Sequence, residues 1–291
     1  MSGDRIFPIR FERTSIPMKT DYIHHGDCAK FLPTLPDGSI NLVVTSPPYD
    51  DMRRYGSHEF DFEAIAQELN RVLAYGGVIV WVVADAFRKD KRGSMSLSSF
   101  KQAIYFDNLG LNVHDVMIWD RHSMRFPRSN GYTQVVQYMF ILSRGKPSTF
   151  NPLSVPKLGG GRKDRYQTGW QPEIDRVERK RTSTRKGRSL YTNIWKMYAG
   201  YNHSTKDNYT FQHPATFPEE LAHRHILTWS NPGDIVLDPM CGSGTTLKMA
   251  KMNRRRYIGC EAHKPYYDMS VRRVTEQTKI TLDSYIEQPI H

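Results

Sequence analysis

The sequence lacks the features that would indicate a secreted, membrane-bound or metal-binding protein. Its 291 residues include three cysteines, Cys28, Cys241 and Cys260, and no two of them form a CxxC pair. Neither a disulfide framework nor a zinc site is therefore indicated. No apolar run approaches the roughly 18 residues of a membrane span, and residues 1–10 lack the apolar core of a signal peptide. We expect a cytoplasmic enzyme with reduced thiols and no bound metal.

Positive charge is plentiful and unevenly distributed. The formal net charge is +11, and the stretch from Lys157 to Arg188 holds eleven lysine and arginine residues against four acidic ones. Such a local excess suits a polyanion such as nucleic acid better than a small anionic substrate. Tyr166 and Trp170 are the large apolar side chains of this stretch, too few for a core of its own. We therefore expect a basic insert that leans on the main domain or orders on binding.

Outside this insert, apolar strands alternate with amphipathic helices, as in an α/β fold. Glycines 76 and 77 are expected to end the first long helix, and Thr216 to Glu219 fits a capping box ahead of a later one. The histidines of that later helix, His223 and His225, are read as surface or packing residues. Strands are expected at 22–27, 40–44, 78–83, 113–119, 135–142, 233–238 and 257–261, and helices around 62–73, 100–109, 219–227, 247–252 and 266–274.

One strand runs directly into a rigid corner. The apolar residues 40–44 are followed by Thr45, Ser46, two prolines and Tyr49. Two consecutive prolines stiffen the loop and fix the directions of its carbonyl groups. Asp27 ends the preceding strand. Because ligands of open α/β sheets bind at the carboxyl ends of strands, Asp27 and the corner should face one crevice if their strands are neighbours.

A second informative stretch starts at Asp238 and continues through a glycine-bearing loop, residues 239–246, into a helix. The next strand ends at Glu261, which lies 23 positions beyond Asp238. One helix and one strand return that acid to the loop, where it can accept hydrogen bonds from the two ribose hydroxyls of an adenosine cofactor. The loop has neither GxGxxG nor a GK[ST] lysine, which argues against a dinucleotide or ATP.

These two stretches resemble the motifs of a known family. Residues 238–246, DPMCGSGTT, resemble the cofactor motif DPFxGSGTT of S-adenosylmethionine-dependent DNA amino-methyltransferases, and residues 45–49, TSPPY, resemble their catalytic motif. Because the catalytic motif comes first and a basic stretch separates the two, the order is similar to the β group of that family. Met240 departs from the usual Phe but keeps apolar bulk.

The resemblance implies a Rossmann-like methyltransferase fold: a mixed, mostly parallel sheet flanked by helices, plus a small basic target-recognition insert. It divides the chain into a catalytic half at 21–146, the insert at 147–190 and a cofactor-binding half at 191–280. It implies S-adenosylmethionine as the cofactor, held by Asp27, Phe217, Asp238, Pro239, Met240, Gly242, Ser243, Gly244, Thr245, Thr246 and Glu261.

The resemblance also assigns the chemistry to the TSPPY corner, with Ser46, Pro47, Pro48 and Tyr49 as catalytic residues. The Ser46 side chain and the Pro47 carbonyl would accept the protons of an exocyclic amine, and Tyr49 would stack on a flipped-out base. Ser directly before the two prolines, as at Ser46, is typical of enzymes that modify cytosine N4, whereas Asp there is typical of adenine N6. We therefore favour cytosine and keep adenine as the alternative. A ring-carbon methyltransferase would need a PCQ-like cysteine loop, which the sequence lacks.

The predicted partner is double-stranded DNA, with a restriction endonuclease as a further functional partner and a monomer or homodimer as the oligomeric state. An RNA or protein amine methyltransferase and a non-catalytic DNA-binding regulator are weaker alternatives. The residues expected to contact DNA are Arg125, Arg128, Arg162, Lys163, Arg165, Arg179, Lys180, Arg181, Arg185 and Lys186.

Overall fold

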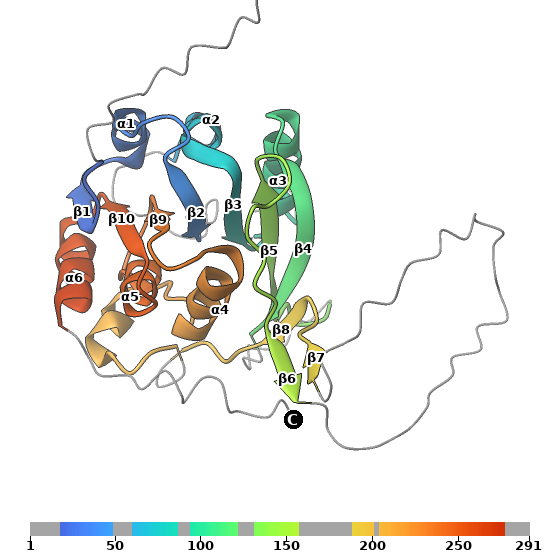
Figure 1. Cartoon of the computed structure of the whole chain (residues 1–291). Coiled ribbons are helices and arrows are strands. Elements are labelled where there is room, and N and C mark those ends of the chain that lie inside the picture. The colour runs from blue at the N-terminus through green and yellow to red at the C-terminus, as the bar shows by residue number, and fades with distance from the viewer. Residues whose placement is uncertain are drawn as a thin grey trace, which may run out of the picture.

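The computed structural model describes residues 18–48, 60–86, 94–121, 131–156, 188–200 and 204–276. Its centre is an eight-stranded sheet of order β1-β10-β9-β2-β3-β5-β4-β8 (Figure 1). All strand pairs are parallel except those that β5 makes with β3 and β4. The predicted mixed, mostly parallel sheet is thus confirmed. Its strands are β1 (Tyr22–His25), β2 (Ile40–Thr45), β3 (Leu73–Val83), β4 (Asn112–Asp120), β5 (Val136–Ser143), β8 (Ile194–Lys196), β9 (Ile235–Asp238) and β10 (Arg256–Glu261).

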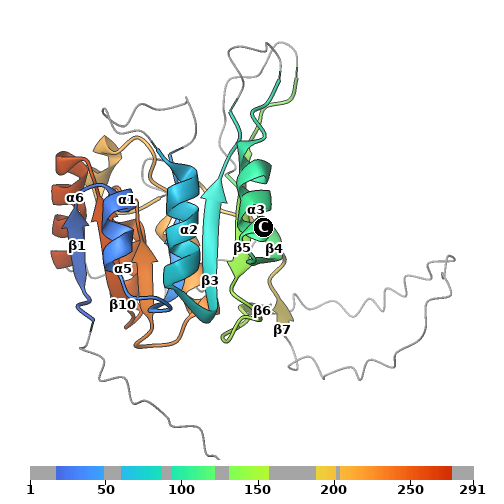
Figure 2. The same ribbon diagram turned by 90° about the horizontal axis from the view of Figure 1, so that it is seen from above.

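Helices cover both faces of the sheet (Figures 1 and 2). One face carries α1 (Cys28–Phe31), α2 (Phe62–Val72) and α3 (Ser98–Asn108), and the other carries α4 (Glu219–Trp229), α5 (Thr245–Met252) and α6 (Lys264–Thr275). Strand β3 shows why both faces are apolar. Its alternate side chains enter two cores, with Trp81 packed beneath the first helix layer and Val80 beneath the second. A strand buried on both faces reads as a continuous apolar run.

The glycine pair does not end α2, contrary to the prediction. The helix stops at Val72 and the chain continues at once as β3, within which Gly76 has φ +78° and donates its N–H to Arg144 O at 2.7 Å. The register between β2 and β3 shifts at this point. The glycines therefore form an irregularity inside the strand, because Gly tolerates positive φ without steric cost.

The predicted capping box of α4 is also wrong. The helix begins at Glu219 after Pro218, and no side chain caps it. Thr216 instead donates its hydroxyl to Thr210 O at 3.4 Å, and Glu219 is buried among other charged groups. His223 and His225 on this helix are buried packing residues.

The two ends of the predicted basic insert meet in a separate two-stranded sheet. Strand β6 (Ser154–Pro156) pairs antiparallel with β7 (Arg188–Leu190), and the chain then enters β8, which extends the main sheet beside β4. Residues 157–187 lie outside the described part of the chain. The stretch is therefore anchored at both ends on the edge of the sheet.

Candidate active site

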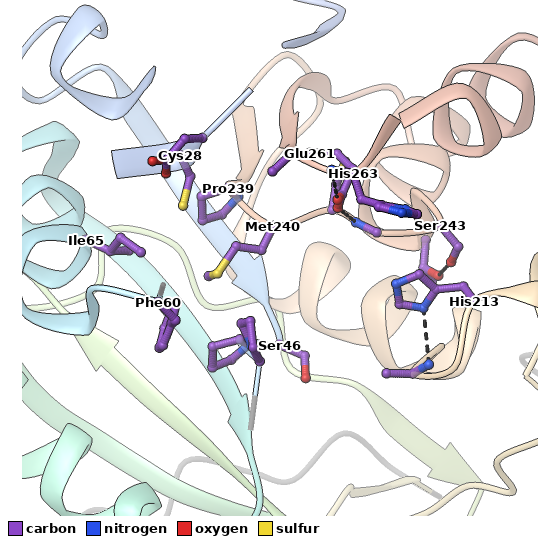
Figure 3. Close-up of a pocket in the computed structure, with 18 of the residues that line it drawn as sticks. Cys28, Ser46, Phe60, Ile65, His213, Pro239, Met240, Ser243, Glu261 and His263 are labelled. Carbon is purple, nitrogen blue, oxygen red and sulfur yellow. Dashed lines mark hydrogen bonds between the residues drawn. The ribbon is translucent and has the colours of Figure 1, made fainter. Parts of the chain in front are cut away.

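The carboxyl ends of β1, β10, β9 and β2 surround one large pocket (Figure 3). It holds about 1070 Å³ of empty space when the open space at its mouth is counted. The strand order shows that β1 and β2 are not neighbours, because β10 and β9 lie between them. Asp27 and the TSPPY corner nevertheless line the same pocket, from opposite sides of β9 and β10.

The strands that carry the two predicted motifs are joined directly. The Thr45 hydroxyl at the end of β2 donates to Asp238 Oδ1 at the end of β9 over 2.7 Å, and the Thr246 hydroxyl donates to Val44 O over 3.0 Å. Chain connections leave this strand pair in opposite directions, so it is the switch point at which open α/β sheets bind ligands. These two buried hydrogen bonds fix the catalytic corner relative to the cofactor loop, residues 239–246.

Asp238 lies beneath the pocket rather than on its surface. Its carboxylate is buried and also accepts the Met240 N–H at 3.2 Å. Burial raises the pKa of Asp238 to about 6, although the hydrogen bonds from the Thr45 hydroxyl and the Met240 N–H oppose that rise. Gly244 and Thr246, which were predicted with Asp238 to hold the cofactor, are likewise absent from the described pocket lining. These three residues therefore lie outside the pocket surface.

The cofactor loop depends on a glycine. Gly242 has φ +49°, and a Cβ atom there would lie 2.7 Å from His213 Nε2. Both residues line the pocket, and His213 also packs edge-on against Tyr266 with ring centroids 4.4 Å apart. The loop backbone thus approaches the opposite wall as closely as glycine alone allows.

Glu261 faces the pocket at the end of β10. One carboxylate oxygen accepts the Gly242 N–H and the other accepts the His263 N–H, each at 2.8 Å. Burial raises the pKa of Glu261, while the backbone donors of His263 and Gly242 oppose that rise. Each oxygen retains a lone pair that can accept a further hydrogen bond.

Asp27 occupies the equivalent place at the end of β1. Its side chain accepts the Ala29 N–H at 2.9 Å and so caps α1, and it also lines the pocket. The next residue, Cys28, is buried at the pocket wall, and burial raises the pKa of its thiol to about 12. This thiol is therefore protonated and inert at neutral pH.

The apolar part of the pocket includes residues that sequence reasoning missed. Phe60, which precedes α2, and Ile65, within α2, lie in Figure 3 on the side of the pocket toward which Met240 points. His213 and His263 complete the opposite side. No local pattern singles out Phe60, because it reaches the pocket only through the packing of α2 on the sheet.

The structure places the predicted site residues as follows. The predicted residues that line the pocket are Asp27, Ser46, Pro47, Pro48, Phe217, Pro239, Met240, Gly242, Ser243, Thr245 and Glu261. Tyr49 and all ten predicted DNA-contacting residues, from Arg125 to Lys186, lie outside the described residues. Within the described ranges, no group of three or more His, Cys, Asp or Glu side chains could hold a metal ion. None of the helices described there is long and apolar enough to cross a membrane.

Comparison with protein families identifies the chain. The family model described as DNA methylase, N6_N4_Mtase, matches residues 40–272, which include both motifs and most of the pocket. The chain belongs to this DNA methylase family. Orphan methyltransferase M.BamHII from Bacillus amyloliquefaciens is 48% identical over 240 residues, 82% of this chain and 89% of that protein. DNA adenine methyltransferase YhdJ from Escherichia coli K12 is 27% identical over 273 residues, 90% of this chain and 85% of that protein.

Solved structures agree with this assignment of the methylase. PvuII DNA methyltransferase (cytosine-N4-specific) superimposes with a TM-score of 0.65, covering 92% of this chain and 90% of that one, and at 19% identity it shows the shared fold. The putative DNA modification methylase TTHA0409 from Thermus thermophilus, complexed with S-adenosyl-L-methionine, has a TM-score of 0.56 at 25% identity and covers 87% of this chain and 96% of that one. The predicted Rossmann-like methyltransferase fold is confirmed.

The pocket of the DNA methylase fits S-adenosylmethionine, the cofactor predicted for it. Carboxylates Asp27 and Glu261 offer acceptors for hydroxyl and amine groups, Gly242 leaves room for close approach, and Phe60 and Met240 provide apolar surface for a flat ring. Together with the family match, this confirms the predicted cofactor.

Proposed function

We propose that this DNA methylase transfers a methyl group from S-adenosylmethionine to the exocyclic N4 amine of a cytosine flipped out of DNA. The observation that carries the proposal is the pocket itself. Ser46, Pro47 and Pro48 line it together with the cofactor loop, and the hydrogen bond between Thr45 and Asp238 joins the two motifs. An amine held at the corner is therefore held beside the cofactor.

In this proposal, Glu261 accepts hydrogen bonds from the ribose hydroxyls and Asp27 faces the adenine end. The remaining pocket residues of the cofactor loop, with Phe217 opposite, hold the other end. When bound, S-adenosylmethionine supplies an electrophilic methyl group carried on a positively charged sulfur. The inert Cys28 and Cys241 thiols do not compete for that methyl group, because burial raises the pKa of each.

The corner residues make the target amine reactive. An exocyclic amine is a poor nucleophile because its lone pair is delocalised into the ring. Ser46 Oγ and the Pro47 carbonyl would accept hydrogen bonds from the amine, so that its lone pair is directed at the methyl group. As the N–C bond forms, the S–C bond would break and leave a neutral thioether, and one amine proton would pass by way of Ser46 Oγ to water. The two prolines hold these acceptors in place before the substrate arrives, so no reorganisation is required at the moment of reaction.

A base inside a duplex must leave the stack to reach this pocket. Flipping costs a few kcal/mol, and stacking on an aromatic ring returns about 1–3 kcal/mol. We assign that stacking to Tyr49 and the phosphate contacts to the basic residues of 147–190, which we propose as the target-recognition insert between the halves 21–146 and 191–280. A DNA substrate and three unpaired thiols are both in keeping with a cytoplasmic enzyme.

Adenine N6 is the second candidate target. Ser46, directly before the two prolines, supports cytosine through the family resemblance. The similarity to a relative named as a DNA adenine methyltransferase supports the alternative. The two bases differ in size, so the walls around the target base should accept one base and exclude the other.

Transfer of tritium from labelled S-adenosylmethionine to duplex DNA, followed by nucleoside analysis, tests the proposal. Label in N4-methylcytosine is the expected result, and label in N6-methyladenine would replace it with the alternative. Ser46→Ala should abolish transfer, whereas Ser39→Ala, in the turn before β2, should not. Label on RNA or protein with none on DNA would overturn both.

A further inference from the structure

Four charged side chains from four separate parts of the chain are buried together behind the cofactor loop. Asp207 precedes the 3₁₀ helix η3 (Asn208–Gln212), Glu219 begins α4, Lys248 lies in α5 and Arg273 lies in α6. Each is at most 3% exposed. We refer to these four residues as the buried charge cluster.

The buried charge cluster is balanced and fully connected. Lys248 Nζ contacts Asp207 Oδ2 at 2.7 Å and Glu219 Oε1 at 2.8 Å. Arg273 contacts the same two oxygens through Nε at 3.0 Å and Nη2 at 2.7 Å. Burial alone raises the pKa of Glu219, but Arg273 and Lys248 outweigh it and leave the pKa below its ordinary value. Two cations and two anions thus compensate each other away from water.

One nitrogen of Arg273 is directed at the cofactor loop rather than at the cluster. Its Nη1 donates to Ser243 O at 3.2 Å, to Ser243 Oγ at 3.0 Å and to Thr245 Oγ1 at 2.8 Å. Ser243 and Thr245 both line the pocket. The guanidinium group therefore holds the loop from the side opposite the cofactor.

The other wall of the pocket is attached to the same cluster. Residues 213–217 form that wall, and they lie between Asp207 and Glu219 in the chain. The Thr205 hydroxyl donates to Glu219 Oε1 at 2.7 Å, and the Glu219 N–H donates to Ser204 O at 2.9 Å. Both ends of the segment that carries His213 and Phe217 are thus fixed beside Arg273.

We propose that Arg273 is a positioning residue for S-adenosylmethionine. Through the buried charge cluster, Arg273 joins the cofactor loop to the wall at residues 213–217. A guanidinium group suits this role because its planar fork serves Asp207, Glu219 and the loop at once. A lysine ammonium would keep the charge but would lack the fixed geometry. The inference deepens the proposed function, since it concerns the cofactor side of the same site.

Calorimetric titration with S-adenosylmethionine, without DNA, tests the proposal on the full-length Arg273→Lys variant. We expect the dissociation constant to rise at least about tenfold, because small displacements in a preorganised site are costly. The matched control is Arg272→Lys on the same helix, where the side chain is exposed and pairs with Glu276 at 2.8 Å. It should bind within about twofold of the wild type, a change within ordinary surface-substitution effects.

A second set of variants separates positioning from stability. Thr245→Val should weaken S-adenosylmethionine binding when introduced into the wild type. It should weaken binding little further when introduced into Arg273→Lys, because both substitutions remove the same contact between Arg273 and the Thr245 hydroxyl. Thr245→Ser keeps the hydroxyl and should bind like the wild type. Equal losses in both backgrounds, or unchanged affinity in a folded Arg273→Lys protein, would overturn the proposal. If Arg273→Lys does not fold, a Thr245→Val variant that binds S-adenosylmethionine with wild-type affinity would overturn the proposal. A wild type that binds no S-adenosylmethionine would instead overturn the proposed function.

Discussion

The hydroxyl of Thr45 and the carboxylate of Asp238 lie 193 positions apart in the chain and 2.7 Å apart in space. Thr45 is the first residue of the TSPPY stretch and Asp238 is the first residue of the cofactor motif. Neither side chain lines the described pocket, yet their hydrogen bond sets the distance between the two groups of residues that do.

Thr45→Val should therefore destabilise the methylase. The substitution keeps the shape of the side chain but leaves the buried Asp238 carboxylate without one donor, which costs about 1.5–3 kcal/mol in the free energy of unfolding. The pKa of Asp238, already about 6, should rise further. Urea unfolding measures the stability difference. Thr45→Ser keeps the hydroxyl and should cost only about 0.8 kcal/mol for the lost methyl group; equal losses in the two variants would refute the importance of the hydrogen bond.

Gly242→Ala should weaken cofactor binding. The residue has φ +49°, so alanine is strained there by about 1–2 kcal/mol, and its Cβ would meet His213 Nε2 at 2.7 Å. We expect His213 to be displaced and the S-adenosylmethionine dissociation constant to rise at least about tenfold, since both residues line the pocket.

Gly233→Ala is the control for that variant, because Gly233 has φ +90° and nothing lies within 4 Å of the added Cβ. It should lose a similar amount of stability to backbone strain while binding the cofactor normally. A matching loss of affinity at Gly233 would attribute the Gly242 effect to strain alone.

His225 should make the protein sensitive to acid. Burial, and then the charge of Arg224, lowers the pKa of His225 to about 3, and His223 is lowered to about 4 for the same reasons. In the unfolded chain each histidine takes up a proton near its ordinary pKa of about 6.5, whereas in the folded protein it stays neutral down to a lower pH. Stability is therefore complete above pH 6.5 and falls as the pH drops below it, by about 1.4 kcal/mol per pH unit for each histidine.

His225→Phe should flatten this dependence. The His225 ring lies tilted by 34° against Trp195, with centroids 4.6 Å apart, and its Nδ1 finds no partner among the described residues, so phenylalanine fits the site. Urea unfolding at pH 6.5, 5.5 and 4.5 should show a slope smaller by about 1.4 kcal/mol per unit. Asp238, whose raised pKa acts in the opposite sense between about pH 4 and 6, is the same in both proteins. Replacing the exposed His114 with Gln should leave the slope as it is, and an unchanged slope in His225→Phe would contradict the prediction.

Replacing Arg179, Lys180 and Arg181 with Gln should reduce the salt dependence of DNA binding. Each lost phosphate contact lowers the slope of log K against log salt by about 0.9, so three contacts remove about 2.7. Fluorescence anisotropy from about 50 to 200 mM salt measures the slope. The same change at Arg254 and Arg256, at the amino end of β10 and away from the pocket, should leave it unaltered. A constant slope in the triple variant would remove these residues from the DNA interface.

Much of the fold follows from local pattern. Continuous apolar runs predict β3 and β5, and the glycine loop between Asp238 and the helix predicts the position of the cofactor site. These features are readable because a strand buried on both faces and a loop that must approach a ligand impose composition on consecutive residues.

Other features depend on residues distant in the chain. Glu219 has the spacing of a helix cap, but its carboxylate is taken by Lys248 and Arg273. Lys248 itself sits among TTLKMAKM, where it reads as a solvent-facing residue. Phe60 gives no signal of its own. Such roles are set by packing between elements, so no local window contains them.

The order of the sheet also has a consequence for biosynthesis. Strand β1 is at the sheet edge and pairs in the described structure with β10, so that the Gly26 N–H meets Glu261 O at 3.0 Å. The ribosome releases Asp27 more than two hundred residues before Glu261, and until then β1 has no neighbour to pair with. Contacts of such long sequence separation form late. A chain cut short before Arg256 would lack the partner strand of β1 and the Glu261 side of the pocket, so the pocket is complete only once β10 has been made.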